Sequence, residues 1–184
     1  NTLRTTRDEL IRKLEAEGFE CTATMTSPYG IRVIGQGLPA AISDGLAFVQ
    51  DESSQMTSLV LDPKAGDELL DACACPGGKS FSAALMMENE GRVTSRDLHA
   101  SKLPLISSGA EKLGISIIKT EERDSSIPSP EKYTKIICDV PCSGLGVAAK
   151  KTEIKYRPLE KNASLPELQY SILCAVAQSL EVGG

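Results

Sequence analysis

The stretch Glu68-Leu-Leu-Asp-Ala-Cys-Ala-Cys-Pro-Gly-Gly-Lys79 decides the fold of this chain. Its apolar start predicts a buried strand over 68–71, and the residues after the glycines predict a helix over 79–87. Consecutive glycines let the backbone approach a ligand closely, because neither residue carries a Cβ atom. A strand, a glycine turn and a helix in this order are typical of the ligand-binding edge of an α/β sheet.

The alternation of strand and helix continues toward the C-terminus. The sequence predicts strands over 92–95, 115–119 and 135–138, and helices over 103–113 and 165–180. Repeated βαβ units require parallel neighbouring strands joined by crossover helices. We therefore predict an α/β fold with a mostly parallel sheet and helices on both faces.

The residues on the N-terminal side follow another pattern. Thr6 and Glu9 fit a capping box that begins a helix over 7–17, and two short strands are predicted over 19–24 and 31–34. This α-β-β arrangement indicates the remainder of a small α+β accessory domain, which we assign to residues 1–45.

The main domain is assigned to residues 46–184. Its first helix is predicted to start at a cap supplied by Ser53 or Ser54 and to run through Leu61, before Asp62-Pro63 ends it.

Acidic residues stand at the end of each predicted strand of the main domain. Since the carboxyl ends of parallel strands meet at one edge, these carboxylates are expected to surround the glycine turn. Asp97 follows the glycines by about 20 residues, where an acid can accept hydrogen bonds from ribose hydroxyls. The turn lacks the Gly-x-Gly-x-x-Gly pattern of pyrophosphate binders, which favours a nucleoside ligand without a pyrophosphate. The four acids are Asp71, Asp97, Asp124 and Asp139.

A second motif, Asp139-Val-Pro-Cys-Ser-Gly-Leu-Gly146, follows the last predicted strand of the sheet. A structural cysteine would lie inside the strand, as we expect for Cys138. Cys142 instead lies on a loop bounded by proline and glycine, where a thiol can meet a substrate.

With both motifs in hand, the chain resembles the Sun/Fmu (RsmB-like) family of RNA cytosine-5 methyltransferases over nearly its whole length. The combination of Cys-x-x-Pro-Gly-Gly-Lys with Asp-x-Pro-Cys-Ser-Gly-Leu-Gly is highly specific for that family. Cys75 stands where the family more often has alanine, and Ala148-Ala149 replace larger or basic residues. Further matching stretches are 1–6, Val49-Gln-Asp-Glu-Ser-Ser-Gln55, 153–157 and 168–173.

The resemblance implies a Rossmann-like S-adenosylmethionine-dependent methyltransferase fold. It assigns the methionine end of the cofactor to the turn formed by Cys73, Ala74, Cys75, Pro76, Gly77, Gly78 and Lys79. It further implies that Asp97 holds the ribose, that Asp124 lies near the adenine, and that Asp139 borders the cofactor and the target base.

The resemblance also implies a mechanism with two cysteines. A thiolate adds to C6 of cytosine and pushes electron density toward C5, which then accepts the methyl group. In the family a Thr-Cys cysteine attacks, whereas the Pro-Cys-Ser-Gly cysteine, here Cys142, assists product release. The attacking cysteine is expected beyond Gly184, so we expect a truncated catalytic domain without turnover of its own.

A basic loop with one aromatic residue lies next to this motif. It is expected to hold RNA phosphates and to stack a base, although composition alone fits a solvated basic loop equally well. The predicted RNA-binding residues are Lys150, Lys151, Lys155, Tyr156 and Arg157.

Composition limits the remaining possibilities. The net charge of −5 excludes a global positive field, so RNA contacts must use local patches. The spacing of the 6 cysteines does not fit a paired Cys-x-x-Cys metal site, and we expect reduced thiols and no metal. We also expect a cytoplasmic monomer without a membrane segment. The resemblance implies RNA, and specifically ribosomal RNA, as its partner.

Three alternatives stay open at this point. Cys142 itself would attack the base if the chain followed the DNA cytosine methyltransferases. A nicotinamide-dependent oxidoreductase uses the same kind of sheet, but the missing Gly-x-Gly-x-x-Gly disfavours it. A non-catalytic RNA-binding module would bind RNA without any affinity for S-adenosylmethionine.

Overall fold

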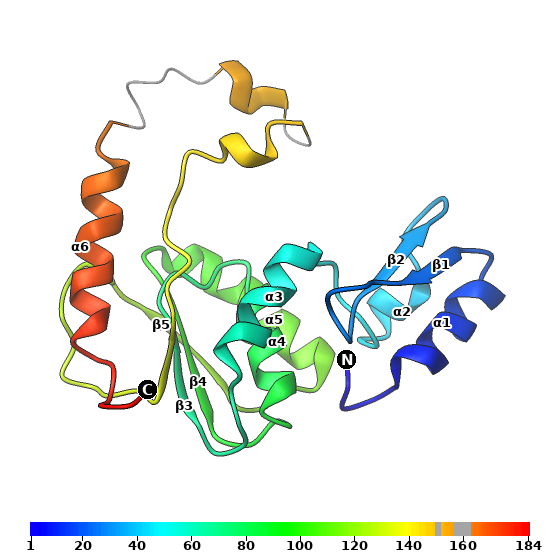
Figure 1. Cartoon of the computed structure of the whole chain (residues 1–184), viewed down its shortest axis with the longest axis horizontal. Coiled ribbons are helices and arrows are strands. Elements are labelled where there is room, and N and C mark those ends of the chain that lie inside the picture. Colours follow the sequence, from blue (N-terminus) through cyan, green and yellow to red (C-terminus); the bar gives the residue numbers. More distant parts are fainter. Residues whose placement is uncertain (150–151, 157–162) are drawn as a thin grey trace.

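The computed structural model describes residues 1–149, 152–156 and 163–184. The N-terminal elements are α1 (Arg7–Ala16), β1 (Glu20–Ala23), β2 (Ile31–Ile34) and α2 (Ala40–Ser43), and they form the blue part of Figure 1. The predicted capping box is present at the start of α1, where the Thr6 amide donates to Glu9 Oε2 over 2.9 Å. β1 and β2 pair antiparallel, and α1 packs on them through Leu10 and Leu14.

The main sheet has the order β5-β4-β3-β6, and all its neighbouring strands are parallel. The chain moves outward in one direction from β3 to β4 and β5, and then returns to the other side of β3 to form β6. Strands and helices of this part are α3 (Glu52–Leu61), β3 (Glu68–Asp71), α4 (Gly78–Met86), β4 (Arg92–Asp97), η1 (Ala100–Lys102), α5 (Leu103–Leu113), β5 (Ile118–Glu122), β6 (Lys135–Ile137), η2 (Leu145–Val147), η3 (Thr152–Tyr156) and α6 (Leu165–Ala177).

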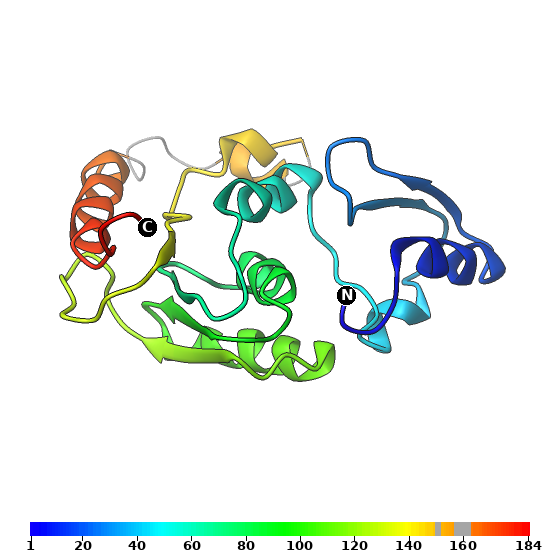
Figure 2. The same ribbon diagram turned by 60° about the horizontal axis from the view of Figure 1, so that its bottom comes forward.

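Two cores cover the two faces of this sheet, because successive side chains of a strand point to opposite sides. Leu69 of β3 packs with α4 and α5, and Leu70 packs with Ile172 and Val176 of α6. Figure 1 shows α6 on one side of the strands and α4 and α5 on the other, and the turned view of Figure 2 agrees. The predicted Rossmann-like α/β arrangement with helices on both faces is confirmed.

Several details of the prediction were wrong. β6 ends at Ile137, so Cys138 follows the strand instead of lying inside it. Asp51, and neither Ser53 nor Ser54, occupies the N-cap of α3. β5 starts at Ile118 rather than at residue 115, because Gly114 ends α5 in the left-handed conformation and the Ile115 amide still bonds to the α5 carbonyl of Ala110.

The last helix is shorter than predicted, since α6 ends at Ala177. Leu180, assigned to this helix from its apolar spacing, instead forms a parallel bridge with Tyr133. The helix α2 was not predicted, because four residues give too short a pattern to detect.

Candidate functional site

A hollow of about 190 Å³ lies at the carboxyl end of β3. This is the point where the strand order reverses, with β4 on one side of β3 and β6 on the other. Open parallel sheets bind their ligands at such a reversal. We call this hollow the cradle. The predicted cofactor-binding residues that line it are Cys73, Ala74, Cys75, Pro76, Gly78, Lys79 and Asp139.

The two glycines of the turn serve different purposes. Gly77 has φ +107°, and a Cβ atom there would lie 2.6 Å from the ring of Phe81. Gly77 therefore shapes the turn and does not line the cradle. Gly78 begins α4 and lines the cradle, and the nearest atom to a Cβ placed there is Gln50 Nε2 at 3.5 Å.

Asp71 lies under the glycine turn and is completely buried at the end of β3. Ser80 Oγ donates to Asp71 Oδ2 over 2.7 Å, and Ser95 Oγ donates to Ser80 Oγ over 2.8 Å. Burial raises the pKa of Asp71 to about 6, against the lowering effect of the Ser80 hydrogen bond. Within the described part of the chain, Asp71 Oδ1 has no hydrogen-bond partner of good geometry, although the Cys73 amide lies close enough to lower the pKa of Asp71. An unsatisfied oxygen at the wall of a hollow is a polar group available to a ligand.

Lys79 and Asp139 form an ion pair across the mouth of the cradle. Lys79 Nζ lies 2.5 Å from Asp139 Oδ2, and the carboxylate side chain is more than half exposed. The pair joins the first turn of α4 to the residues after β6. It therefore connects the two predicted motifs.

Two of the predicted acids lie outside the lining of the cradle. Asp97 Oδ1 accepts a hydrogen bond from the His99 amide over 2.9 Å and lies 3.3 Å from Lys102 Nζ. Asp97 is nevertheless close enough to raise the pKa values of Cys73 and Cys75 through its charge, after the larger effect of burial. Asp124 accepts hydrogen bonds from Ser126, which lower its pKa.

Three thiols near the carboxyl ends of β3 and β6 are held in their neutral form. Burial raises the pKa of Cys73 to about 12, with further raising by Cys138 and Asp71. Burial also raises the pKa values of Cys75 and Cys138. A thiol with a raised pKa is a poor nucleophile at neutral pH, so none of these three fits an attacking role.

The predicted catalytic thiol lies on the loop after β6. Cys142 is exposed and does not line the cradle, and the carbonyl oxygen of its neighbour Pro141 accepts a 2.8 Å hydrogen bond from Gln169 Nε2 of α6. Tyr156 ends η3 and is 86% exposed. The predicted RNA-binding residues Lys150, Lys151 and Arg157 lie outside the described residues, as does the side chain of Lys155.

A larger cavity of about 380 Å³ lies between the N-terminal elements and the helices α3 and α4. Its walls are mainly apolar, with Phe19, Ile31, Phe48 and Leu85 among them, and it contains none of the predicted site residues. The cradle, although smaller, carries the charged groups that can orient a polar ligand.

A comparison with known sequences decides the family. The sequence profile of the family described as 16S rRNA methyltransferase RsmB/F matches residues 58–184. This chain belongs to the RsmB/F methyltransferase family. A relative from Bacillus subtilis, named as a probable ribosomal RNA small subunit methyltransferase B, is 37% identical over the whole of this chain, which covers 43% of that relative. The chain thus spans less than half of the length of this RsmB-named relative.

Solved structures agree with this membership. The crystal structure titled PH0851 superposes with a TM-score of 0.94 at 28% identity, covering all of this chain and 43% of the other. The structure of NSun6 from Pyrococcus horikoshii with SFG gives a TM-score of 0.88 at 20% identity, covering all of this chain and 72% of the other. The fold of this RsmB/F chain is that of the S-adenosylmethionine-dependent methyltransferases.

The cradle of this RsmB/F chain fits such a cofactor on two counts. The space beside Gly78 is one that a side chain would fill, and the unsatisfied Asp71 Oδ1 provides a polar contact at its base. Among the residues that the structure describes, no group of His, Cys, Asp and Glu side chains could hold a metal ion. No helix in the same residues is long and apolar enough to cross a membrane.

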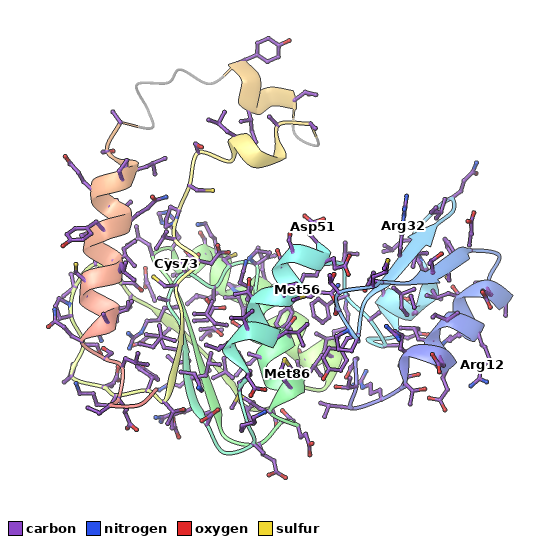
Figure 3. The ribbon with its side chains drawn as sticks, in the orientation of Figure 1. Arg12, Arg32, Asp51, Met56, Cys73 and Met86 are labelled. Atoms are coloured by element: carbon purple, nitrogen blue, oxygen red, sulfur yellow. The ribbon has the colours of Figure 1, made fainter. Side chains whose placement is uncertain are left out.

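One part of the cradle escaped the sequence analysis. Val49, Gln50, Asp51 and Ser54 also line the hollow, and Figure 3 shows Asp51 at the start of α3 and Cys73 near the end of β3. These residues belong to the stretch 49–55, whose resemblance to the RsmB-like family implies no particular role for them. The sequence gives no sign of this contact, because residues 49–55 precede the first strand of the sheet. Ligand sites in parallel sheets are expected at residues that follow a strand.

Proposed function

We propose that this chain is the cofactor-binding part of an enzyme that methylates C5 of a cytosine in RNA, with small-subunit ribosomal RNA as the substrate. The observation that carries the proposal is the cradle, in a chain of the RsmB/F family, between the end of β3 and the residues after β6. The names of the relatives support ribosomal RNA as the substrate class.

In this proposal S-adenosylmethionine supplies the methyl group as a sulfonium. The turn from Cys73 to Lys79 surrounds the methionine end, and the ion pair of Lys79 with Asp139 holds the mouth of the cradle in shape. Asp97 accepts hydrogen bonds from the ribose, and Asp124 lies toward the adenine. The pKa of Asp71, raised to about 6, leaves this carboxylate mostly ionised at neutral pH, which supports a role as a hydrogen-bond acceptor at the base.

Methylation at C5 requires a thiolate that adds to C6 of cytosine and a proton acceptor that later removes the C5 proton. We assign attack to the cysteine of a Thr-Cys pair and product release to Cys142. None of the 6 cysteines of this chain follows a threonine. We therefore expect the chain as given to bind the cofactor without turnover.

RNA is proposed to reach the site along the loop that includes Tyr156. Its exposed ring supports stacking on an unpaired base, and the neighbouring lysines and Arg157 are assigned to phosphates. A cytosine inside a helix would have to be flipped out of its stack before a thiol could reach C6.

Calorimetric titration of the chain with S-adenosylhomocysteine and, separately, with NAD tests the cofactor assignment. Binding of S-adenosylhomocysteine alone is expected. Binding of NAD alone would overturn the proposal in favour of the oxidoreductase alternative. No affinity for either cofactor, together with binding in a parallel titration with RNA, would leave a non-catalytic RNA-binding module.

The roles of the cysteines are tested in the full-length enzyme with labelled cofactor and unmodified ribosomal RNA. Replacement of Cys142 by alanine is expected to trap a covalent enzyme–RNA adduct, because release is impaired after attack. Loss of the adduct would instead identify Cys142 as the attacking residue. Cysteine-dependent methyl incorporation by the 184-residue chain alone would contradict the expected lack of turnover.

A further inference from the structure

The carboxylate of Glu52 attaches the loop between β1 and β2 to the first turn of α3. Glu52 Oε1 accepts hydrogen bonds from the Thr26 amide over 2.9 Å and from the Ser27 amide over 3.2 Å. It also accepts one from Thr26 Oγ1. These hydrogen bonds lower the pKa of Glu52, so the carboxylate is ionised at neutral pH and forms charge-assisted contacts.

A second contact lies next to the first. Ser27 is completely buried, and its Oγ donates to Gln55 Oε1 over 2.6 Å. A Cβ atom on Gly30 would lie 3.1 Å from the same Gln55 oxygen and 2.2 Å from Thr24 Oγ1. The absence of a side chain at Gly30 thus leaves room for Thr24 inside the loop and for the Gln55 side chain of α3. The loop and the first turn of α3 therefore pack closely against each other.

The other side of the same segment forms a wall of the cradle. Gln50, Asp51 and Ser54 line the hollow, and Ser82 Oγ donates to Gln50 Oε1 over 2.8 Å. The amide of Gln50 thus lies along α4, with its nitrogen beside Gly78. Within the described residues this nitrogen is buried and has no hydrogen-bond partner.

We propose that Glu52 is a positioning residue for the cofactor: by anchoring the loop from Thr24 to Gly30 onto α3, it fixes the wall formed by Gln50, Asp51 and Ser54. The inference rests on the proposed function, because it takes the cradle as the cofactor site. Glu52 lies between Asp51 and Ser54 in the sequence, and its side chain reaches the loop while theirs face the hollow. Release of the loop therefore loosens the start of α3 and the cradle wall together.

The consequence is a coupling between the N-terminal elements and cofactor binding. A loop that stabilises the closed wall raises the affinity for the cofactor, and the bound cofactor must stabilise the loop by the same factor. Both directions can be measured without turnover. The first uses affinity, and the second uses hydrogen exchange of the loop amides.

The affinity test titrates the chain with S-adenosylhomocysteine by calorimetry. Glu52→Ala is expected to weaken binding by roughly 5- to 10-fold, within the usual range of coupling between sites. Glu52→Gln keeps one acceptor oxygen for the Thr26 and Ser27 amides and is expected to restore most of the affinity. Glu9→Ala is the matched control, because it breaks the capping box of α1 in the same N-terminal part without touching α3. Its affinity is expected to match that of the wild type.

The second test needs no variant and therefore does not depend on whether Glu52→Ala folds. Addition of S-adenosylhomocysteine to the wild type is expected to slow hydrogen exchange at the Thr26 and Ser27 amides. The inference would be overturned if Glu52→Ala bound within 2-fold of wild type, if Glu9→Ala weakened binding equally, or if exchange at both amides were unchanged. If the wild type itself does not bind S-adenosylhomocysteine, the proposed function fails first and the inference fails with it.

Discussion

Lys79 Nζ lies 2.5 Å from Asp139 Oδ2, and this contact joins the start of α4 to the residues after β6. Lys79 is 19% exposed and Asp139 is 56% exposed in their side chains, so water screens the pair and its contribution to stability is below about 1 kcal/mol. We predict that Lys79→Ala changes the free energy of unfolding by less than that amount and weakens S-adenosylhomocysteine binding at least roughly 5-fold. Urea denaturation and calorimetry measure the two effects.

The control for this prediction is Lys64→Ala, which removes a surface pair of the same 2.5 Å length with Asp62, away from the cradle. Its affinity should equal that of the wild type. Equal affinities of Lys79→Ala and the wild type would show that Lys79 does not shape the cradle.

The two glycines of the turn should respond differently to alanine. Gly78→Ala is expected to retain or slightly raise stability, by roughly 0.5–1 kcal/mol, because alanine is favoured in a helix and its Cβ has 3.5 Å of clearance. It should still weaken ligand binding, since the methyl group stands in the cradle. Gly77→Ala is expected to lose at least about 1 kcal/mol because of its φ of +107° and the contact with Phe81. Denaturation curves and calorimetry on both variants check this contrast; a Gly78→Ala variant with full affinity would contradict it.

The raised pKa of Asp71 predicts a pH dependence of stability. Because the folded state holds this proton up to about pH 6 and the unfolded state releases it near 3.8, the contribution is present below about pH 4 and is lost as the pH rises through about 6. Asp71→Asn keeps an acceptor for Ser80 but cannot ionise. Its stability relative to wild type should rise between pH 4 and pH 7, by at most about 3 kcal/mol. Urea titrations at both pH values test this, and parallel curves for the two proteins would refute the assignment to Asp71.

Arg96 is expected to be important for stability rather than for binding. It is 2% exposed, and its guanidinium contacts Glu121 over 2.7 Å and Glu131 over 2.5 Å. Arg96→Lys retains the charge but loses the fork that holds both carboxylates, so we predict a loss of roughly 1–3 kcal/mol. Unfolding by urea measures it. A loss below about 0.5 kcal/mol would show that the two partly exposed carboxylates relax into water without cost.

The sequence predicted the parallel sheet, the two helical faces and most of the cradle, because each depends on local order. A short apolar strand that is followed by an acidic residue or a glycine turn can be recognised from its own sequence, without knowledge of the residues that it contacts. The capping box of Thr6 and Glu9 is equally local, and it was found at the predicted position.

What escaped prediction depends on contacts between distant residues. Gln50 faces Gly78, and Glu52 holds the Thr26 amide, but neither spacing follows a helical or strand period. Leu180 continued the apolar face of α6 in the sequence, yet its pairing with Tyr133 takes it out of the helix. The assigned ligand roles of Asp97 and Asp124, and the release role of Cys142, stay predictions.

A thiol next to a bound S-adenosylmethionine could be methylated by it. The raised pKa of Cys73, about 12, prevents this reaction. A sulfonium is an alkylating agent, and an ionised thiol beside it would capture the methyl group and inactivate the protein. Because only the thiolate is strongly nucleophilic, a protonated Cys73 can touch such a donor without consuming it. In the proposed cofactor site, the same burial that packs Cys73 against β6 would thus protect its thiol from methylation.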